Sequence, residues 1–157
     1  ELKINIDFAS EYLVDISLNT KSENKTILCL KDNFILLEFS FVSVPNNLYE
    51  IIFKLQIEGY KVILAHPERY KYLYNSLENF IKLKKHGCFF QLNLFSTIGY
   101  YGNEVMKYAD KLLKYDLIDF VGTDIHNITQ VDLFSKEIQI KEIEKLKEAI
   151  GSNSIFK

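Results

Sequence analysis

Short apolar runs alternate with segments of helical periodicity along most of this 157-residue chain. The runs are apolar throughout, as in parallel strands that helices cover. A strand, helix, strand, helix order predicts right-handed parallel βαβ units. The predicted fold class is therefore α/β, with parallel strands and outer helices. A distorted or incomplete (β/α) barrel is the first choice, and an open doubly wound sheet is the alternative.

Hydrophobic periodicity and the residues typical of turns and helix ends predict the individual strands and helices. The expected strands are residues 2–8, 11–15, 27–30, 34–39, 62–66, 88–93 and 118–121. The expected helices are residues 48–56, 73–83, 105–115 and 131–150, and the polar stretch 17–26 is expected to be a loop. Lys31-Asp32-Asn33 is the expected turn between two of the strands, because Asp and Asn tolerate positive φ. Gly59 and Gly87 stand where helix C-caps belong.

Composition excludes several classes of protein. The formal net charge is −2, so the chain lacks the basic excess of a general nucleic-acid binder. No apolar run approaches the roughly 20 residues that a membrane span needs. Cys29 and Cys88 lie in apolar stretches without paired spacing, which predicts two buried, reduced thiols and a cytoplasmic protein.

Residues 1–157 fit the length of one domain. The chain has no initiator Met and opens directly into an alternating pattern. We therefore expect a single domain that is an N-terminally truncated fragment of a longer protein.

Three of the apolar runs carry His, Asp or Glu at or near their ends. Glu38 ends one run, His66 ends a second just before Pro67, and Asp124 and His126 follow a third. In parallel α/β folds the carboxyl ends of the strands are where sites are built. Carboxylate and imidazole ligands together suit Mn, Fe or Zn. On an extended backbone Asp124 and His126 would point the same way.

Each of these residues also has a structural interpretation. Asp124 could cap a following helix with His126 packed beside it, and His66 could be a core histidine. Glu38 at a buried position needs a partner, which could be a lysine or Arg69 instead of a metal. His86 stands apart at a helix end, where a solvated C-cap residue is expected.

Arg69 is the only arginine in the chain, beside eighteen lysines. Lysine therefore serves wherever a simple positive charge is enough. An arginine three residues beyond His66 fits a need for two parallel hydrogen bonds to phosphate or carboxylate. The alternative is a structural ion pair with Glu38 or Glu68.

The sequence resembles the PHP (polymerase and histidinol phosphatase) superfamily. Within it, the chain is most similar to the metal-dependent tyrosine phosphatases of bacterial capsule and exopolysaccharide operons (CpsB/CapC type). The matching text is Ala9-Ser10-Glu11-Tyr12, Leu37-Glu38-Phe39-Ser40, Gln56 to Gly59, Ala65-His66-Pro67-Glu68-Arg69, Gln91-Leu92-Asn93 and Gly122-Thr123-Asp124-Ile125-His126-Asn127. The resemblance covers residues 9–127.

The resemblance implies a distorted β/α barrel of PHP type with up to three Mn, Fe or Zn ions at the carboxyl ends of its strands. The metal ligands that it implies are Glu11, Glu38, His66, Asp124 and His126. Arg69 would bind the substrate phosphate, with His66 and Asp124 also counted among the catalytic residues. Hydrolysis by a metal-bound hydroxide would need no cysteine nucleophile. The implied partners are a phosphotyrosine protein and the tyrosine kinase of the same operon, with self-association left open.

Two family features have no counterpart in these 157 residues. The family opens with His-x-His on its first strand, and a second arginine often follows its Asp-x-His-Asn motif. We therefore expect this chain alone to bind fewer metals than its parent and to hydrolyse phosphate esters poorly. Two alternatives remain, a PHP phosphatase for a small ester such as histidinol phosphate and a non-catalytic binding or regulatory remnant.

Overall fold

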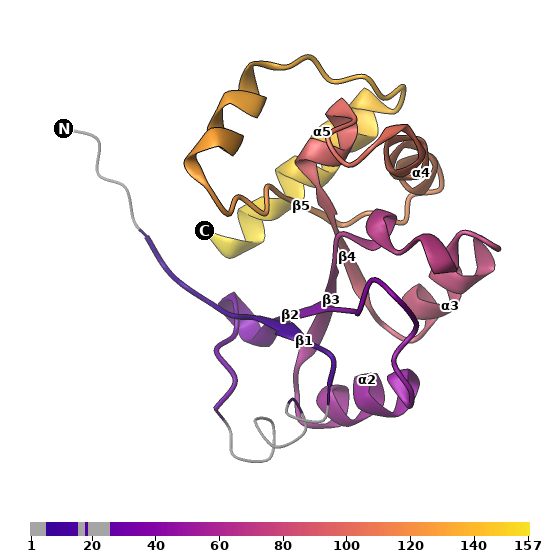
Figure 1. Cartoon of the computed structure of the whole chain (residues 1–157). Helices are drawn as coiled ribbons and strands as arrows, with labels where there is room; N and C mark the ends of the chain where they lie inside the picture. The colour runs from indigo at the N-terminus through magenta and orange to yellow at the C-terminus, as the bar shows by residue number, and fades with distance from the viewer. Residues whose placement is uncertain (1–5, 16–17, 19–25) are drawn as a thin grey trace.

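The computed structural model describes residues 6–15, 18 and 26–157. These residues form one parallel α/β unit with five strands (Figure 1). The strands are β1 (Glu11–Leu13), β2 (Phe34–Glu38), β3 (Lys61–Ala65), β4 (Phe89–Asn93) and β5 (Phe120–Gly122). The helices are α2 (Leu48–Ile57), α3 (Glu78–Lys85), α4 (Asn103–Lys114) and α5 (Ile143–Ser152).

The spatial order of the strands is β1-β2-β3-β4-β5, the same as their order along the chain, and every pair is parallel. A doubly wound sheet would reverse its order at one point, so that alternative is wrong. Consecutive right-handed crossovers place successive helices on one face, as in a β/α barrel. Figure 1 shows α2, α3 and α4 along one side of the sheet. Among the described residues β1 does not pair with β5, so the barrel is open there.

Successive side chains along each strand point to opposite sides of the sheet, so the sheet has two apolar faces. On the helix-covered face, Ile35 and Leu37 of β2 pack with Val62 and Leu64 of β3 in the largest core cluster. The residues from the helices in this cluster are Leu48, Ile52, Leu55, Phe80, Leu83, Tyr108 and Leu112. Burial on this face therefore fixes the helices against the sheet.

The opposite, inner face carries a small aromatic core. Phe34 makes edge-to-face contacts with Phe89, Phe120 and Phe156, at ring-centroid distances of 5.3, 5.8 and 5.4 Å. Ile63 packs in the same cluster and is fully buried. The last turn of the chain, Asn153–Phe156, thus closes the inner face with Phe156. Aromatic bulk fills the base of the inner face.

Several sequence expectations are wrong at the level of elements. Residues 6–8 of the expected first strand are not in a strand, while residues 2–5 and most of the expected loop 17–26 lie outside the described residues. Residues 27–30 do not join the sheet; Leu30 donates its amide to the carbonyl of Phe34 at 2.8 Å. The expected helix 73–83 starts later, at Glu78, whose amide donates to Ser76 Oγ at 3.1 Å.

The expected helix 131–150 is two shorter elements. Residues Ile128–Ser135 form 3-10 turns and α5 begins only at Ile143. Between them the amides of Lys141 and Glu142 donate to Oδ1 of Asp110 in α4, at 2.8 and 2.9 Å. Because a side chain from another helix binds these amides, the α-helix starts after them.

Two smaller expectations concern the thiols and membrane spans. Cys88 is buried, but Cys29 is only half-buried, and neither forms a disulfide. Within the described part of the chain, no helix has both the length and the apolarity needed to cross a membrane.

Candidate metal centre

His66 lies at the point where β3 gives way to a tight turn. The strand residues Val62 to Ala65 are all buried, and the amide of His66 still donates to the carbonyl of Gln91 at 2.7 Å. His66 itself has a φ of 34°, and Pro67 then begins a 3-10 turn. Pro67 fixes its own φ and cannot continue a strand ladder. The imidazole therefore stays at the carboxyl end of β3 and is 3% exposed.

Strand register places two glutamates on the inner face beside His66. Glu38 ends β2 four residues after Phe34, so its side chain points to the same inner face on which Phe34 packs. Glu11 of β1 pairs with Leu36, so it faces the same side as Glu38. The two carboxylates therefore come from neighbouring strands and converge from one side of the sheet.

The three side chains meet around one point. Nε2 of His66 lies 3.4 Å from Oε1 of Glu11 and 3.6 Å from Oε2 of Glu38. One donor atom from each of the three residues lies within 4.8 Å of the other two. Neither ring nitrogen of His66 has a hydrogen-bond partner among the described residues, although the ring is buried. A buried ring nitrogen without a hydrogen bond leaves a position for a further ligand.

Charge at this point favours a cation. Burial favours the neutral imidazole, but the carboxylates of Glu11 and Glu38 outweigh it and raise the pKa of His66 to about 9. Contact with His66 lowers the pKa of Glu38, with burial opposing this change. The negative potential that holds a proton on His66 would also attract a metal ion.

The geometry of the three donors fits a metal ion. Zinc binds imidazole nitrogen and carboxylate oxygen at about 2.0–2.2 Å, which places neighbouring ligand atoms roughly 3–3.5 Å apart. The Glu11–His66 and Glu38–His66 separations of 3.4 and 3.6 Å agree with this spacing to within a few tenths of an ångström. Nitrogen and carboxylate oxygen donors suit Zn, Fe or Mn and not a soft-ligand metal such as Cu(I).

Asp124 belongs to a second group, centred on Arg69. Nη1 of Arg69 donates to Oδ2 of Asp124 at 3.0 Å, and both side chains are mostly buried. The side-chain amide nitrogen of Asn93, Nδ2, donates to the same oxygen at 3.3 Å and to the hydroxyl of Tyr101 at 3.1 Å. Asp124 lies two residues beyond β5 with a φ of 52°. The backbone at Asp124 is therefore not extended, so the condition under which Asp124 and His126 would point the same way is not met.

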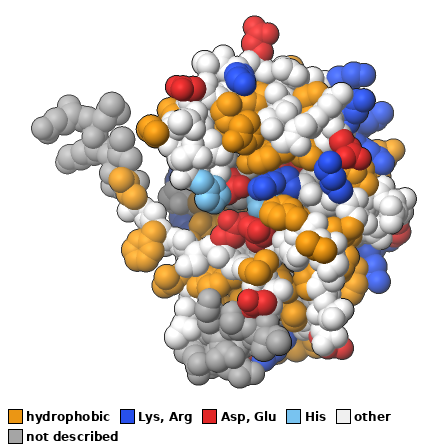
Figure 2. All heavy atoms as spheres, in the orientation of Figure 1, with side chains coloured by type: hydrophobic (Ala, Val, Ile, Leu, Met, Phe, Trp, Pro, Cys, Tyr) orange, Lys and Arg blue, Asp and Glu red, His pale blue; other side chains and the backbone are white. Residues whose placement is uncertain are grey.

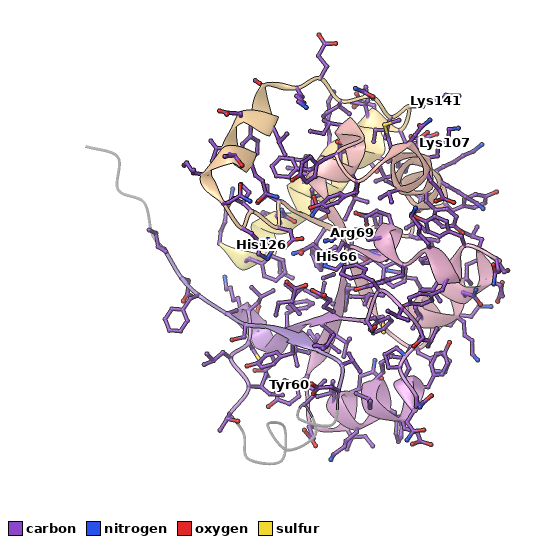
Figure 3. All side chains as sticks on the ribbon, viewed as in Figure 1. Tyr60, His66, Arg69, Lys107, His126 and Lys141 are labelled. Carbon is purple, nitrogen blue, oxygen red and sulfur yellow. The ribbon has the colours of Figure 1, made fainter. Side chains whose placement is uncertain are left out.

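His126 is the most exposed of the expected ligands. Its side chain is 73% exposed, and Nδ1 lies 2.9 Å from the carbonyl of Asp124 and 3.4 Å from its Oδ1. Figure 3 shows His66 and Arg69 close together, with His126 farther along the same side of the molecule. The structure thus gathers Glu11, Glu38 and His66 in one cluster and sets Asp124 and His126 together beside it.

Two structural alternatives from the sequence do not match this arrangement. Asp124 is not a helix cap, because Asn127 caps the Ile128–Ser135 turns in a reciprocal capping box with Gln130. Arg69 forms an ion pair with Asp124 and not with Glu38 or Glu68. His86 is an exposed helix C-cap residue as expected, and its Nδ1 lies 2.8 Å from the carbonyl of Lys82.

Sequence reasoning named Glu68 only as an alternative ion-pair partner of Arg69 and assigned no separate role to Asn93. The buried Glu68 carboxylate accepts hydrogen bonds from the backbone N–H of Asn93 at 3.0 Å and from Oγ of Ser96 at 2.6 Å. Its other oxygen, Oε2, has no partner among the described residues, and burial raises the pKa of Glu68. Asn93 could have been found, because it ends the apolar run 88–93 as Glu38 and His66 end theirs.

Figure 2 shows acidic, basic and histidine side chains meeting in one patch, with apolar side chains on either side. Carboxylates and a buried histidine at the carboxyl ends of parallel strands lie where parallel α/β folds build their sites. The family described as Capsular polysaccharide synthesis, CpsB/CapC matches residues 1–147. The chain belongs to this family.

Individual relatives agree with the family match. The tyrosine-protein phosphatase YwqE of Bacillus subtilis (strain 168) is 30% identical over 114 residues, which are 72% of this chain and 45% of that protein. The tyrosine-protein phosphatase CpsB of Streptococcus pneumoniae is 28% identical over 129 residues, 78% of this chain and 53% of that protein.

A solved structure shares the fold. It comes from a study of YwqE and CpsB as unique metal-dependent tyrosine phosphatases. It superposes with a TM-score of 0.73 at 25% identity, over 94% of this chain and 59% of the solved chain. The chain therefore spans about half the length of the curated relatives that it matches.

Proposed function

We propose that this protein is a metal-dependent phosphatase that hydrolyses phosphotyrosine on proteins. One observation carries the proposal: Glu11, Glu38 and His66 converge on one point while both ring nitrogens of the buried His66 lack hydrogen-bond partners among the described residues. The relatives named as tyrosine-protein phosphatases supply the substrate class. The structural match to a metal-dependent tyrosine phosphatase supports a metal-binding role for the cluster.

Each group has a role in the proposed reaction. Metal ions, when bound, supply a Lewis acid and a water molecule of lowered pKa. Glu11, Glu38 and His66 would hold one such ion, and Asp124 with His126 would contribute ligands beside it. Arg69 would bind phosphoryl oxygens with the N–H groups that its ion pair with Asp124 leaves free. Both cysteines are left out of the reaction, since burial raises the pKa of each thiol.

We further propose that residues 1–157 lie in a single PHP-like domain whose remaining metal ligands come from outside this stretch. The described residues provide one cluster of three donors. The resemblance to capsule-operon phosphatases favours the tyrosine kinase of the same operon as a protein that it dephosphorylates. Two free cysteines favour a cytoplasmic protein.

The test combines metal analysis with two substrates. The purified protein is stripped with a chelator, reloaded with Mn, Fe or Zn, and its metal content is measured. Hydrolysis of a phosphotyrosine peptide is then compared with hydrolysis of histidinol phosphate. We expect metal uptake that Glu38→Gln weakens, and chelator-sensitive turnover that is slow but favours the phosphotyrosine peptide. Preference for histidinol phosphate would replace the substrate class, and absence of any metal binding would reject the proposal.

A further inference from the structure

The guanidinium of Arg69 lies close to two aromatic rings. Its Cζ is 4.6 Å from the ring centroid of Phe41 and 4.3 Å from that of Tyr101. Phe41 comes from the segment after β2, and Tyr101 from the segment just before α4. Cationic groups at this distance from aromatic rings are attracted by the ring quadrupole. Two segments more than fifty residues apart therefore meet at the only arginine of the chain.

Hydrogen bonds also hold the groups around the guanidinium. One edge, at Nη1, is held by Asp124 at 3.0 Å. Asn93 bridges Asp124 and the Tyr101 hydroxyl, so the ring of Tyr101 and the ion pair are positioned by one amide. Movement of the guanidinium away from this position would weaken both ring contacts and the ion pair.

Burial in the core does not explain the position of Phe41, because its side chain is 46% exposed. The ring stacks against the imidazole of His66, at a centroid distance of 5.6 Å and an interplanar angle of 25°, and lies beside Tyr70 at 5.7 Å. Phe41 therefore borders both the metal cluster and Arg69.

We propose that Phe41 and Tyr101 are positioning residues that hold Arg69 so that only its free edge is open to a ligand. This inference rests on the proposed function, because the ligand that it implies is a phosphate monoester. A tetrahedral oxyanion accepts parallel N–H bonds in the plane of a guanidinium. The two rings, with centroids 4.6 and 4.3 Å from Cζ of Arg69, leave less room for a planar group to stack on the guanidinium. We call Phe41, Tyr101 and Asp124 around Arg69 the clamp. The clamp thus selects an anion that binds edge-on.

Arg69 can be followed by chemical labelling, because it is the only arginine in the 157 residues. The protein is treated with phenylglyoxal, and the rate of adduct formation is measured by mass spectrometry. We expect Phe41→Leu and Tyr101→Leu each to raise the labelling rate by about threefold, and the double variant by about tenfold, as two weak cation–π contacts predict. Phe41→Tyr and Tyr101→Phe keep a ring and should label within about twofold of the parent.

The matched control is Phe53→Leu, at an exposed phenylalanine of α2 outside the site. It should label like the parent, and circular dichroism should show that all variants are folded. If both leucine variants also label at the parental rate, the rings do not hold Arg69 and the proposal is wrong.

Inorganic phosphate tests the edge-on geometry. In the parent it should slow labelling of Arg69, and in the leucine variants its protective effect should weaken by about threefold or more, as loss of a weak cation–π contact predicts. Equal protection in all variants would contradict the proposal. Ring-dependent labelling and protection without metal-dependent turnover would support the clamp and reject the phosphatase function, so the two failures are distinguishable.

Discussion

Nε2 of His66 lies 3.4 Å from Oε1 of Glu11, although their strands, β3 and β1, are not neighbours in the sheet. The side chains reach over β2, which contributes Glu38 to the same cluster. Three strands therefore supply one donor each. A single substitution of each donor residue can test the centre independently.

Replacing one carboxylate should weaken metal binding. Glu38→Gln keeps the shape of the side chain but removes its charge, and we expect the dissociation constant for Zn or Mn to rise by at least about tenfold. Titration calorimetry on the chelator-stripped protein measures the change. The matched control is Glu50→Gln, at an exposed residue of α2, which should bind metal like the parent. Equal affinities for parent and Glu38→Gln would remove Glu38 from the centre.

Metal binding should also stabilise the fold. A ligand at about 100 times its dissociation constant adds about 2.7 kcal/mol to the free energy of unfolding. For a domain of this size, that corresponds to a rise in Tm of roughly 5–10 °C. Thermal unfolding of the stripped protein with and without added metal measures it. The double variant Glu11→Gln/Glu38→Gln should lose the shift, and a shift of the same size in that variant would place the metal elsewhere.

Arg69→Lys should keep the charge and lose the planar fork. In a form of the protein with measurable aryl phosphatase activity, we expect kcat/KM to fall by roughly tenfold or more, or about 1.4 kcal/mol of transition-state stabilisation. Metal content and Tm should change little, because lysine can still pair with Asp124. Full activity with a Tm many degrees lower would instead make the Arg69–Asp124 contact structural.

The two thiols should be inert in catalysis and differ in reactivity. Burial raises the pKa of Cys88 to about 12, so almost none of it is thiolate at neutral pH. Cys29 is half-buried, and its pKa is raised too. We expect iodoacetamide to alkylate Cys29 before Cys88 in the native protein, without loss of metal-dependent hydrolysis. Inactivation that tracks alkylation of Cys88 would indicate a cysteine nucleophile and contradict the metal mechanism.

The inner aromatic core should dominate stability at the base of the sheet. Phe34 is 2% exposed and contacts three other phenylalanines. Phe34→Ala should therefore lower the free energy of unfolding by about 3–5 kcal/mol, measured by denaturant titration. Phe53→Ala, at a side chain that is 63% exposed, is the matched control and should have a much smaller effect. Similar losses in both variants would show that the inner face is not a packed core.

Local periodicity alone predicted much of the scaffold. The parallel strands β2 to β5 and helices α2 and α4 follow from apolar runs and helical spacing, because each buries one face against its neighbours. The same rule placed Glu38, His66 and Asp124 near strand ends, where a parallel sheet brings side chains together. These features depend on residues close in the chain, so the sequence determines them by itself.

Tertiary contacts decided the rest. The expected helix 131–150 breaks because Asp110, from a different helix, binds the amides of Lys141 and Glu142. Arg69 pairs with Asp124 and contacts the rings of Phe41 and Tyr101, partners that no local spacing predicts. Strand register, which is set by burial across the whole sheet, brought Glu11 within reach of His66. The sequence alone determined which residues could form a site, and long-range packing decided which of them touch.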